Sequence, residues 1–429
     1  ENIAFLLNNF FKINPDKVIS THPRYYELYF KNKNKKEFTT QDLLDLQVWF
    51  NLSWIDPSFR ESIPELKQLV FKGRFFNEED KRVVLNKQLG ILNRIIPTYR
   101  KFAESGQIEI TFTPFYHPIL PLLYNTNIAK EANRRTLLPA KSFSFPHDAF
   151  EQIKEAAILA KDKFGSLCNG MWPSEESVCE HIIKYFIQNK IKWIVADEAI
   201  LYKSLKKKTR DTRLLYQPFV LKREEGELNI VFRDRNLSDL IGFIYHNWDA
   251  QDAASDFMKH LENIANAFKD QDMLLVMAMD GENAWEYFKN DGHDFLKTLY
   301  KKISDAKFIK TTTISEYLKI NPPKKEIKRL SAGSWIYGNF DKWMNHPYKA
   351  RAWEWLSIAR SELQELLDNN ALDEGKKQLA IKQMHIAEGS DWFWWYGEDP
   401  DGDFDRLFKM HLGNFYDIIG KKTPDYLVR

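Results

Sequence analysis

Two adjacent carboxylates follow an aromatic residue in the stretch GMWPSEESV (residues 170–178), between segments that are otherwise apolar. Trp172 and Pro173 come first, and Glu175 and Glu176 come directly after Ser174. A solvent-exposed loop has no need of the tryptophan, and a buried segment tolerates acids only where they are paired or functional. The stretch is therefore the first candidate for a site that does chemistry.

Further acids stand where strands are expected to end. Asp280 ends the apolar run DMLLVMAM and is followed by Glu282, and Glu109 lies in QIEIT. In parallel α/β folds functional groups collect at the carboxyl ends of strands. Two carboxylates on one pocket can do acid/base chemistry or form a covalent intermediate, and glycoside hydrolysis needs such a pair. Trp172 and Trp285 offer flat faces on which a sugar could stack.

Structural roles remain open for each of these residues. Asp280 could cap the helix predicted after it, and Glu175 or Glu176 could be a first-turn acid that interacts with a helix dipole. His117, in FYHPILPLL, could bind a ligand just past a strand, although a histidine there is more often hydrogen-bonded near a turn.

Composition limits the class of protein. The 429 residues are 44% hydrophobic and 28% charged, which is typical of a soluble globular protein, and the net charge of +2 gives no reason to expect nucleic acid or an anionic membrane as partner. Aromatic residues reach 14%, with 13 Trp, which suits carbohydrate stacking, although most rings are expected in the core. Cys168 and Cys179 cannot form a disulfide framework or a zinc cluster, and we expect both to be inert. No HxxxH or HxH pair occurs, so neither a metal site nor a cofactor is predicted.

The elements that must position the acids change along the chain. Residues 1–105 are predicted to be helical, and from residue 107 strands and helices alternate, which is typical of βαβ units and a parallel sheet. The segments expected as strands, or as apolar runs of strand length, are 107–115, the residues near Gly170, 191–199, 228–234, 240–246, 272–285 and 306–318. The helices expected after residue 105 are 146–164, 181–190, 252–269, 346–368 and 373–388.

A Pro- and Lys-rich link, NPPKKEIKR (321–329), separates this α/β part from a helical C-terminal region. We therefore expect a catalytic α/β domain at 1–330, with a helical insertion at 1–105, followed by a helical region at 331–429.

Four motifs in order carry a family resemblance. They are GQIEI (106–110), GMWPSE (170–175), MDGENAW (279–285) and AEGSDWFWW (387–395). Each resembles one of the five signature regions of glycoside hydrolase family 57. The text between them, such as AGSWIYGNFDKW, is similar to the amylopullulanase-like and alpha-amylase-like catalytic domains of that family.

The resemblance implies a retaining enzyme that acts on α-glucans by double displacement, on an incomplete (β/α)7 barrel followed by an all-helical region. It implies Glu175 as the nucleophile and Asp280 as the general acid/base, with carboxyl groups about 5–5.5 Å apart. Glu109 and Glu282 would be polar supports of the site. Glu176 stands where relatives usually have Gly.

The remaining residues of the implied site would bind the sugar. Asp391 and Trp394, from the helical region, would close over it, and His117, Trp172 and Trp285 would contact it. The expected partner is an α-glucan polysaccharide or oligosaccharide, and the sequence leaves the oligomeric state open. It also leaves open hydrolysis against transglycosylation and α-1,4 against α-1,6 preference.

One family feature is absent. The first signature, a His-x-Pro motif on the first barrel strand, has only a poor substitute in STHPRYY (20–26), whose surroundings are predicted to be helical. We expect the chain to be a fragment of a longer protein that lacks the first strand or strands; localisation stays open, with the cytoplasm favoured. The alternatives are an inactive glucan-binding homologue, a 4-alpha-glucanotransferase or branching enzyme, and a metal-dependent deacetylase, for which we find no Asp-His-His set.

Overall fold

The computed structural model describes residues 2–165, 168–269, 271–281, 285, 287–398 and 402–428. The chain forms two compact units. The first comprises Glu1–Phe102, Asn236–Gln271 and Met279–Thr311, and the second comprises Ala103–Arg235, Asp272–Ala278 and Thr312–Arg429. Within the described residues no helix is both long and apolar enough to span a bilayer.

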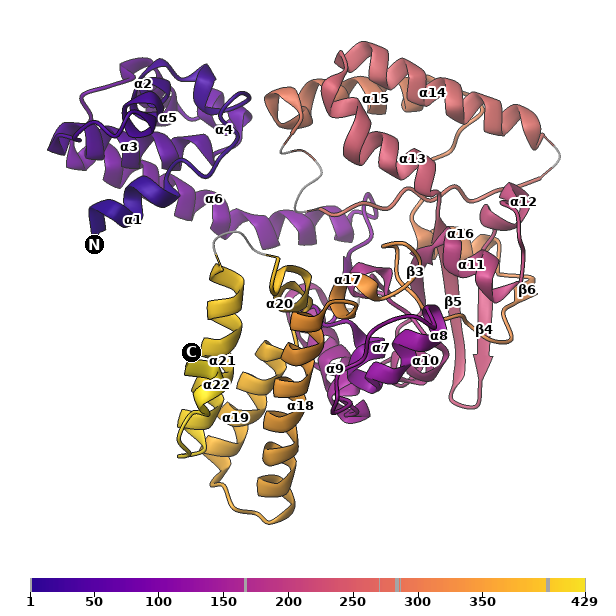
Figure 1. Ribbon diagram of the computed structural model, residues 1–429. Helices are drawn as coiled ribbons and strands as arrows, with labels where there is room; N and C mark the ends of the chain where they lie inside the picture. Colours follow the sequence, from indigo (N-terminus) through magenta and orange to yellow (C-terminus); the bar gives the residue numbers. More distant parts are fainter. Residues whose placement is uncertain are drawn as a thin grey trace. The chain divides into compact units, whose positions relative to one another are not determined.

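The N-terminal part of the first unit is helical, as predicted (Figure 1). Its helices are α1 (Asn2–Asn9), a 3-10 turn (Ile19–Thr21), α2 (Pro23–Lys33), α3 (Thr40–Ser53), α4 (Pro57–Ser62), α5 (Pro64–Lys72) and α6 (Glu78–Glu104).

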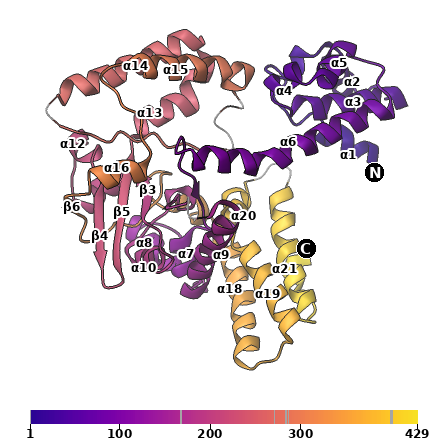
Figure 2. The ribbon, with the colours of Figure 1, turned by 180° about the vertical axis from the view of Figure 1, so that it is seen from behind.

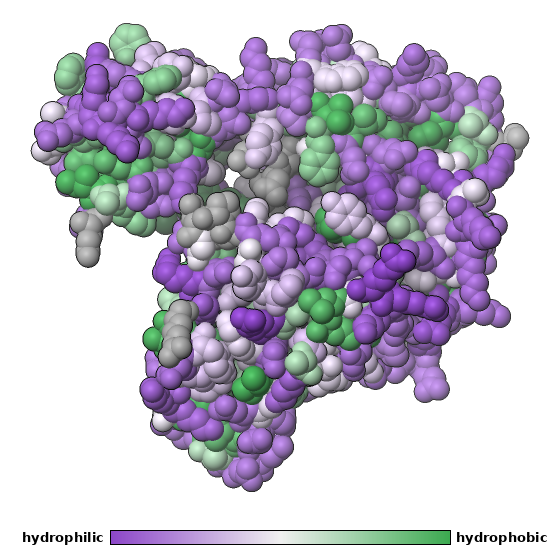
Figure 3. Space-filling view, in the orientation of Figure 1, coloured by the Kyte–Doolittle hydropathy of each residue, from purple (hydrophilic) through white to green (hydrophobic). Residues whose placement is uncertain are grey.

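The start of α3 shows how sequence sets a helix boundary. Thr39 accepts a hydrogen bond from the backbone N–H of Asp42, and the Asp42 carboxylate accepts one from the backbone N–H of Thr39, which forms a capping box. The helix then buries Leu46, Trp49 and Leu52 in a core that α2, α5 and α6 share. Figure 3 also shows hydrophobic side chains on the surface of these N-terminal helices.

The rest of the first unit is mainly helical within its described residues. Its elements are α13 (Arg235–Asp239), a π-helix (Leu240–Ile244), a 3-10 turn (Tyr245–Asn247), α14 (Ala250–Ala267), a 3-10 turn (Lys289–Gly292) and α15 (His293–Asp305). The prediction for α14 is confirmed. The apolar run 240–246 is helical rather than a strand, with Ile241 and Tyr245 buried and Phe243 and Ile244 exposed.

The second unit contains a six-stranded sheet in the order β1-β2-β3-β5-β4-β6. Its strands are β1 (Thr111–Phe112), β2 (Gly170–Met171), β3 (Trp193–Asp197), β4 (Phe219–Arg223), β5 (Gly226–Arg233) and β6 (Lys325–Glu326). All neighbouring pairs are parallel except β4 and β5, which form an antiparallel hairpin. Figure 2 shows β3, β5, β4 and β6 side by side. The predicted α/β class with a mostly parallel sheet is confirmed.

Two further predicted strands are wrong. In 272–285, the described residues 272–280 lie outside the sheet ladders, and the segment bonds to loops: Leu274 N–H donates to the Tyr216 carbonyl (3.0 Å) and Asp234 N–H to the Val276 carbonyl (2.8 Å). Leu274 and Ala278 still pack against the sheet residues Trp193 and Val231, which explains the apolar pattern. In 306–318 the first residues are irregular and the rest begin α16 (Ile314–Ile320).

Helices complete the second unit. They are α7 (Leu120–Tyr124), α8 (Ala129–Ala132), α9 (Pro146–Phe164), α10 (Ile183–Gln188), α11 (Glu198–Ser204), α12 (Thr212–Leu215), α16, α17 (Asp341–Met344), α18 (Pro347–Asp368), α19 (Glu374–Ala387), α20 (Ser390–Trp395), α21 (Asp403–Ile418) and α22 (Asp425–Val428), with 3-10 turns at Thr126–Ile128, Ser174–Glu176 and Glu180–Ile182. The predictions for α9, α18 and α19 are confirmed. Figures 1 and 2 show α18, α19 and α21 side by side.

Candidate active site

Strand β2 leads directly to the predicted nucleophile. A side chain at Gly170 would place its Cβ 2.2 Å from the Trp193 ring, so only glycine fits this position in β2. Parallel pairing with β1 continues through Trp172, whose N–H donates to the Phe112 carbonyl (2.9 Å). The chain then turns at Pro173 into a single 3-10 turn, which brings the next residues to the carboxyl end of the strand.

Glu175 is half-buried and sits at a strained backbone position. Its φ of 57° lies in the left-handed region, which a non-glycine residue adopts only where the surroundings hold it. Trp335 helps to stabilise this conformation. Its backbone N–H donates to the Glu175 carbonyl (3.1 Å), and its indole Nε1–H donates to Glu175 Oε2 (2.7 Å).

Aromatic and cationic groups surround this carboxylate. The Trp172 and Trp335 rings meet edge to face, with centroids 5.4 Å apart and planes at 87°. The guanidinium of Arg233, a side chain only 5% exposed, lies 4.9 Å above the Trp335 ring, within the range of a cation–π interaction.

The ends of β3 and β5 contribute a buried charge network. Asp197 is fully buried and accepts hydrogen bonds from the Ala199 N–H (2.8 Å) and from Arg235, whose Nε lies 3.2 Å away. Arg233 Nε is 3.5 Å from the same carboxylate, and Arg233 Nη1 donates to the Ala278 carbonyl (3.1 Å). Asp197 thus fixes two arginines at the carboxyl edge of the sheet.

A second network lies beside it. Arg210 donates from Nε and Nη2 to Glu198 (3.0 and 2.9 Å) and from Nη2 to Asp234 (2.8 Å), which also accepts from the Tyr216 hydroxyl (2.7 Å). Burial, with a contribution from the Asp234 carboxylate, raises the pKa of Tyr216 well above its usual range. Tyr216 therefore stays a neutral donor.

Glu109 is engaged by structural partners. It precedes β1, and its carboxylate accepts hydrogen bonds from Trp193 Nε1–H (3.0 Å), from the Ser315 backbone N–H (2.9 Å) and from the Ser315 hydroxyl. These contacts join the segment before β1 to β3 and α16.

His117, Asp391 and Trp394 lie on contacting segments of the second unit. His117 has a φ of 55°; its Nδ1 lies 2.8 Å from the Ser390 hydroxyl, and its carbonyl accepts from the Ser390 N–H (3.1 Å). The structure therefore places His117 at the start of α20, next to the exposed Asp391. Trp394, on the same helix, packs edge to face on Trp343 with centroids 5.7 Å apart.

A buried carboxyl group in this region has no counterpart among the predicted site residues. Glu388 is fully buried and accepts a hydrogen bond from Gln152 Nε2–H (2.9 Å). Burial, followed by the nearby charge of Asp148, raises the pKa of Glu388 well above its usual range. Asp148 in turn accepts two hydrogen bonds from Arg360 (2.6 and 2.9 Å). This cluster joins α9 to α18 and to the AEGSDWFWW motif.

Asp280 and Trp285 belong to the first unit, whereas Glu175 belongs to the second. Asp280 is half-buried at the end of the irregular segment 272–280, and Trp285 packs on Phe288 and Phe295, with ring centroids 5.4 and 6.4 Å away. Glu282 lies outside the described residues. The catalytic pairing of Glu175 with Asp280 stays a prediction.

The sequence missed Trp335, Arg233 and Glu388 as members of these clusters. A signal existed for two of them, since AGSWIYGNFDKW contains Trp335 and AEGSDWFWW contains Glu388, but neither motif says which partner the side chain meets. Arg233 carried no signal beyond its place at the end of a predicted strand.

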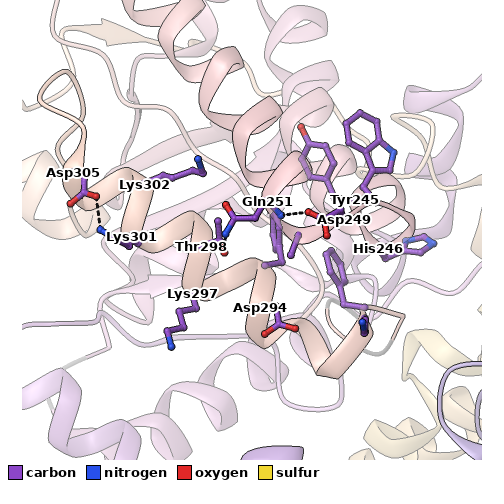
Figure 4. A pocket seen from close by; sticks show the side chains of 15 residues that line it. Tyr245, His246, Asp249, Gln251, Asp294, Lys297, Thr298, Lys301, Lys302 and Asp305 are labelled. Carbon is purple, nitrogen blue, oxygen red and sulfur yellow. Dashed lines mark hydrogen bonds and ion pairs between the residues drawn. The ribbon is translucent and has the colours of Figure 1, made fainter. Parts of the chain in front are cut away.

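A separate cavity of about 740 Å³ lies in the first unit. Figure 4 shows Tyr245, His246 and Asp249 at one end of it and Lys301, paired with Asp305 (2.8 Å), at the other. Its lining contains none of the predicted site residues that the structure describes.

Neither metal ligation nor thiol chemistry is favoured by the described residues. No group of three or more His, Cys, Asp or Glu side chains could hold a metal ion in the part of the chain that the structure describes. Cys179 is buried, which raises the pKa of its thiol to about 12, and burial also raises the pKa of Cys168. Both thiols are therefore protonated near neutral pH, as expected for inert cysteines.

Comparisons with known proteins agree with this fold. The model of the glycosyl hydrolase family 57 matches residues 4–329. A stretch of 97 residues, 23% of this chain, is 34% identical to alpha-amylase 1 of Dictyoglomus thermophilum, and it spans only 11% of that protein's length.

Solved structures extend the likeness of fold to the whole chain. A GH57 branching enzyme from Thermococcus kodakaraensis matches with a TM-score of 0.63 and 14% identity over 99% of this chain and 88% of its own. The alpha-amylase AmyC from Thermotoga maritima matches with a TM-score of 0.60 and 15% identity over 100% and 88%. The 4-alpha-glucanotransferase from Thermococcus litoralis matches with a TM-score of 0.55 and 16% identity over 82% and 52%.

Proposed function

The chain belongs to glycosyl hydrolase family 57, an enzyme family, and from this premise we propose that it cleaves α-glucans with retention of anomeric configuration. Glu175 is the proposed nucleophile and Asp280 the proposed general acid/base. The observation that carries the proposal is the setting of Glu175: a carboxylate at the carboxyl end of β2, hydrogen-bonded by Trp335 and flanked by the Trp172 ring.

This setting suits the first half of a double displacement. A nucleophilic carboxylate must be ionised and fixed toward the anomeric carbon, and the indole N–H supports both requirements because it donates to the charged form. Attack forms a glycosyl–enzyme ester at Glu175 while Asp280 protonates the leaving oxygen; Asp280 then takes a proton from the water that hydrolyses the ester. The remaining predicted residues, His117, Trp285, Asp391 and Trp394, would hold successive glucose units.

The architecture proposed for this site is an incomplete (β/α)7 barrel. The parallel pairs β1-β2, β2-β3 and β3-β5 support it, because they put the ends of several strands at one edge of the sheet, where barrel enzymes carry their sites. The expected division at residue 330, with the helical region completing the pocket, remains part of this proposal.

Product analysis tests the function. The parent, Glu175→Gln and Asp280→Asn are incubated with amylose, a maltooligosaccharide and pullulan. We expect short α-anomeric products from the parent, activity lower by about 10³-fold or more without the nucleophile, and lower by about 10²–10⁴-fold without the acid/base. Proton NMR of the first product reports the anomer, and the three substrates distinguish α-1,4 from α-1,6 cleavage.

Two matched controls separate chemistry from loss of a surface charge. Glu224→Gln changes an exposed glutamate between β4 and β5, and Asp272→Asn changes an exposed aspartate at the start of the segment that ends in Asp280. Both should keep parental activity. Equal activity of Glu175→Gln and the parent would refute the proposed mechanism.

A second outcome is transfer instead of hydrolysis, since one protein of similar fold is a branching enzyme and another is a 4-alpha-glucanotransferase. A retaining intermediate can be captured by a sugar hydroxyl instead of water. Products longer than the maltooligosaccharide supplied would identify transfer, and retention of amylose without any product would identify an inactive glucan-binding homologue.

A further inference from the structure

Trp335 donates hydrogen bonds to both the backbone and the side chain of Glu175. It comes 160 positions later in the chain, and its indole-to-carboxylate distance of 2.7 Å is short for an N–H donor, as expected for a charge-assisted hydrogen bond. A single residue thus counteracts the strain of a left-handed glutamate and fixes its carboxylate.

The loop that carries Trp335 is itself fixed to the strand end. Val178 and Gly333 exchange two backbone hydrogen bonds (2.9 and 3.1 Å). Gly333 has a φ of 154°, and a Cβ there would lie 2.4 Å from the Gly338 carbonyl oxygen, so the loop closes in a form open only to glycine. The Ser334 hydroxyl, which donates to the Asn339 carbonyl (2.6 Å), ties the same loop together.

The indole is also held from its sides. The Arg233 guanidinium lies over the ring face at 4.9 Å, and the Trp172 ring meets it at 87°. Arg233 is anchored in turn by the Ala278 carbonyl and lies beside buried Asp197. Arg233 therefore covers this face of the Trp335 ring, so a sugar cannot stack on it.

We propose that Trp335 is a positioning residue, which holds the Glu175 carboxylate ionised and in one orientation through its indole N–H. The inference rests on the proposed nucleophilic role of Glu175 and adds the residue that prepares it. A donor to the ionised form favours ionisation, so its removal makes the carboxylate harder to deprotonate and less well aimed. Substrate binding does not depend on this hydrogen bond.

Trp335→Phe is the central variant because it keeps a ring under Arg233 and removes the N–H. The rate is measured across pH with a maltooligosaccharide. We expect kcat to fall about 10- to 100-fold with KM within about twofold, and the acid limb of kcat/KM to move up by about 1 pH unit. Trp54→Phe, an exposed tryptophan of the first unit (58% exposed), is the control and should change neither quantity.

Trp335→His tests the donor itself, since an imidazole also presents a ring N–H and should recover part of the lost kcat. A role in packing alone predicts no shift of the acid limb and no such recovery. Thermal unfolding is followed for every variant, and if the Phe variant does not fold, the His variant and its pH profile decide.

The outcomes separate this inference from the function on which it rests. A normal pH profile and kcat in Trp335→Phe, together with an inactive Glu175→Gln, overturns the positioning role and leaves the nucleophile in place. Full activity of Glu175→Gln overturns both. A raised KM with unchanged kcat would make Trp335 a binding residue instead.

Discussion

The backbone of Glu176 lies in the left-handed region, with a φ of 51°, directly after Glu175 at 57°. This geometry favours glycine, because glycine alone adopts the left-handed region without steric cost. A residue with a Cβ pays roughly 1–2 kcal/mol there. The tight turn that carries the proposed nucleophile is therefore strained at two consecutive residues.

Comparison of Glu176→Gly with Glu176→Ala tests this strain. Both variants remove the same buried carboxylate, so the difference between them isolates the backbone term. We expect the Gly variant to be more stable than the Ala variant by about 1 kcal/mol, even though glycine elsewhere costs more entropy on folding. Urea unfolding measures the difference. An Ala variant as stable as the Gly variant would show that the turn relaxes to a negative φ.

At the scale of single residues, the sequence could predict which types take part but not their partners. Glu175 was singled out because an acid beside a tryptophan is unusual, and its place after β2 is as expected, while its catalytic role stays a prediction. Trp335 was not found, since a contact across 160 positions leaves no mark on local spacing. Glu109 was assigned to the polar support of the site, and its contacts with Trp193 and Ser315 are compatible with a supporting role, which remains a proposal.

At the scale of elements, the histidine of STHPRYY has a structural setting in the N-terminal helices. His22 precedes α2, stacks on Trp49 of α3 with ring centroids 4.5 Å apart, and its Nε2 lies 3.0 Å from Arg60 Nη1. Burial, followed by the charge of Arg60, lowers the pKa of His22 to about 4. The helical surroundings predicted for this motif are confirmed.

This shift predicts a pH dependence of stability. Between pH 6.5 and 4 the unfolded chain binds a proton at His22 and the folded chain does not, so stability falls as the pH drops through this window. From pH 7.5 to pH 5 the loss should be about 2 kcal/mol. His22→Gln should remove that part of the slope, whereas His147→Gln, an exposed histidine on α9, should not. Denaturant unfolding at both pH values measures it, and equal slopes in parent and His22→Gln would contradict it.

Elements with strong periodicity or caps were predictable, and those defined by pairing were not. Thr39 and Asp42 mark the start of α3 in the sequence, and α9 begins at Pro146 as predicted. In contrast, residues 272–280 are as apolar as a core strand, but their backbone forms hydrogen bonds with loops. An apolar pattern predicts burial and does not show whether a neighbouring strand is present to pair with. The second strand of the β4–β5 hairpin was predicted, but β4 was not, because its apolar run is only three residues long, Phe219–Leu221.

At the scale of the whole molecule, both units are discontinuous in sequence, because Asn236–Gln271 and Met279–Thr311 join the N-terminal helices rather than the sheet. The sequence did not predict this discontinuity. Shifts of composition mark linkers, but they do not show where a later segment packs against an earlier one. Of the proposed catalytic pair, Asp280 belongs to the first unit and Glu175 to the second.

The N-terminal helices nevertheless hold a core of their own. Its buried members lie between Ile19 and Val84, and partly buried residues extend it only to Ile91. Arg24 adds a buried ion network, with Nη2 2.6 Å from Asp42 and Nε 2.8 Å from Asp45. Polar contacts of these helices with the rest of the first unit, such as Lys17 with the carbonyls of His246 and Tyr287, involve exposed or half-buried groups, which contribute little.

We therefore expect residues 1–94 to fold alone. The isolated fragment should show a helical circular dichroism spectrum and one cooperative thermal transition, because burial and not contact with the sheet stabilises it. The same fragment with Arg24→Met is the control; it removes the guanidinium that bridges buried Asp42 and Asp45 and should lose about 3 kcal/mol. Since Leu89 and Leu92 are exposed on α6 (58% and 60%), the transition is measured at several concentrations to separate folding from self-association. A spectrum without helix, or a transition without cooperativity at every concentration, would mean that the N-terminal helices depend on the rest of the chain.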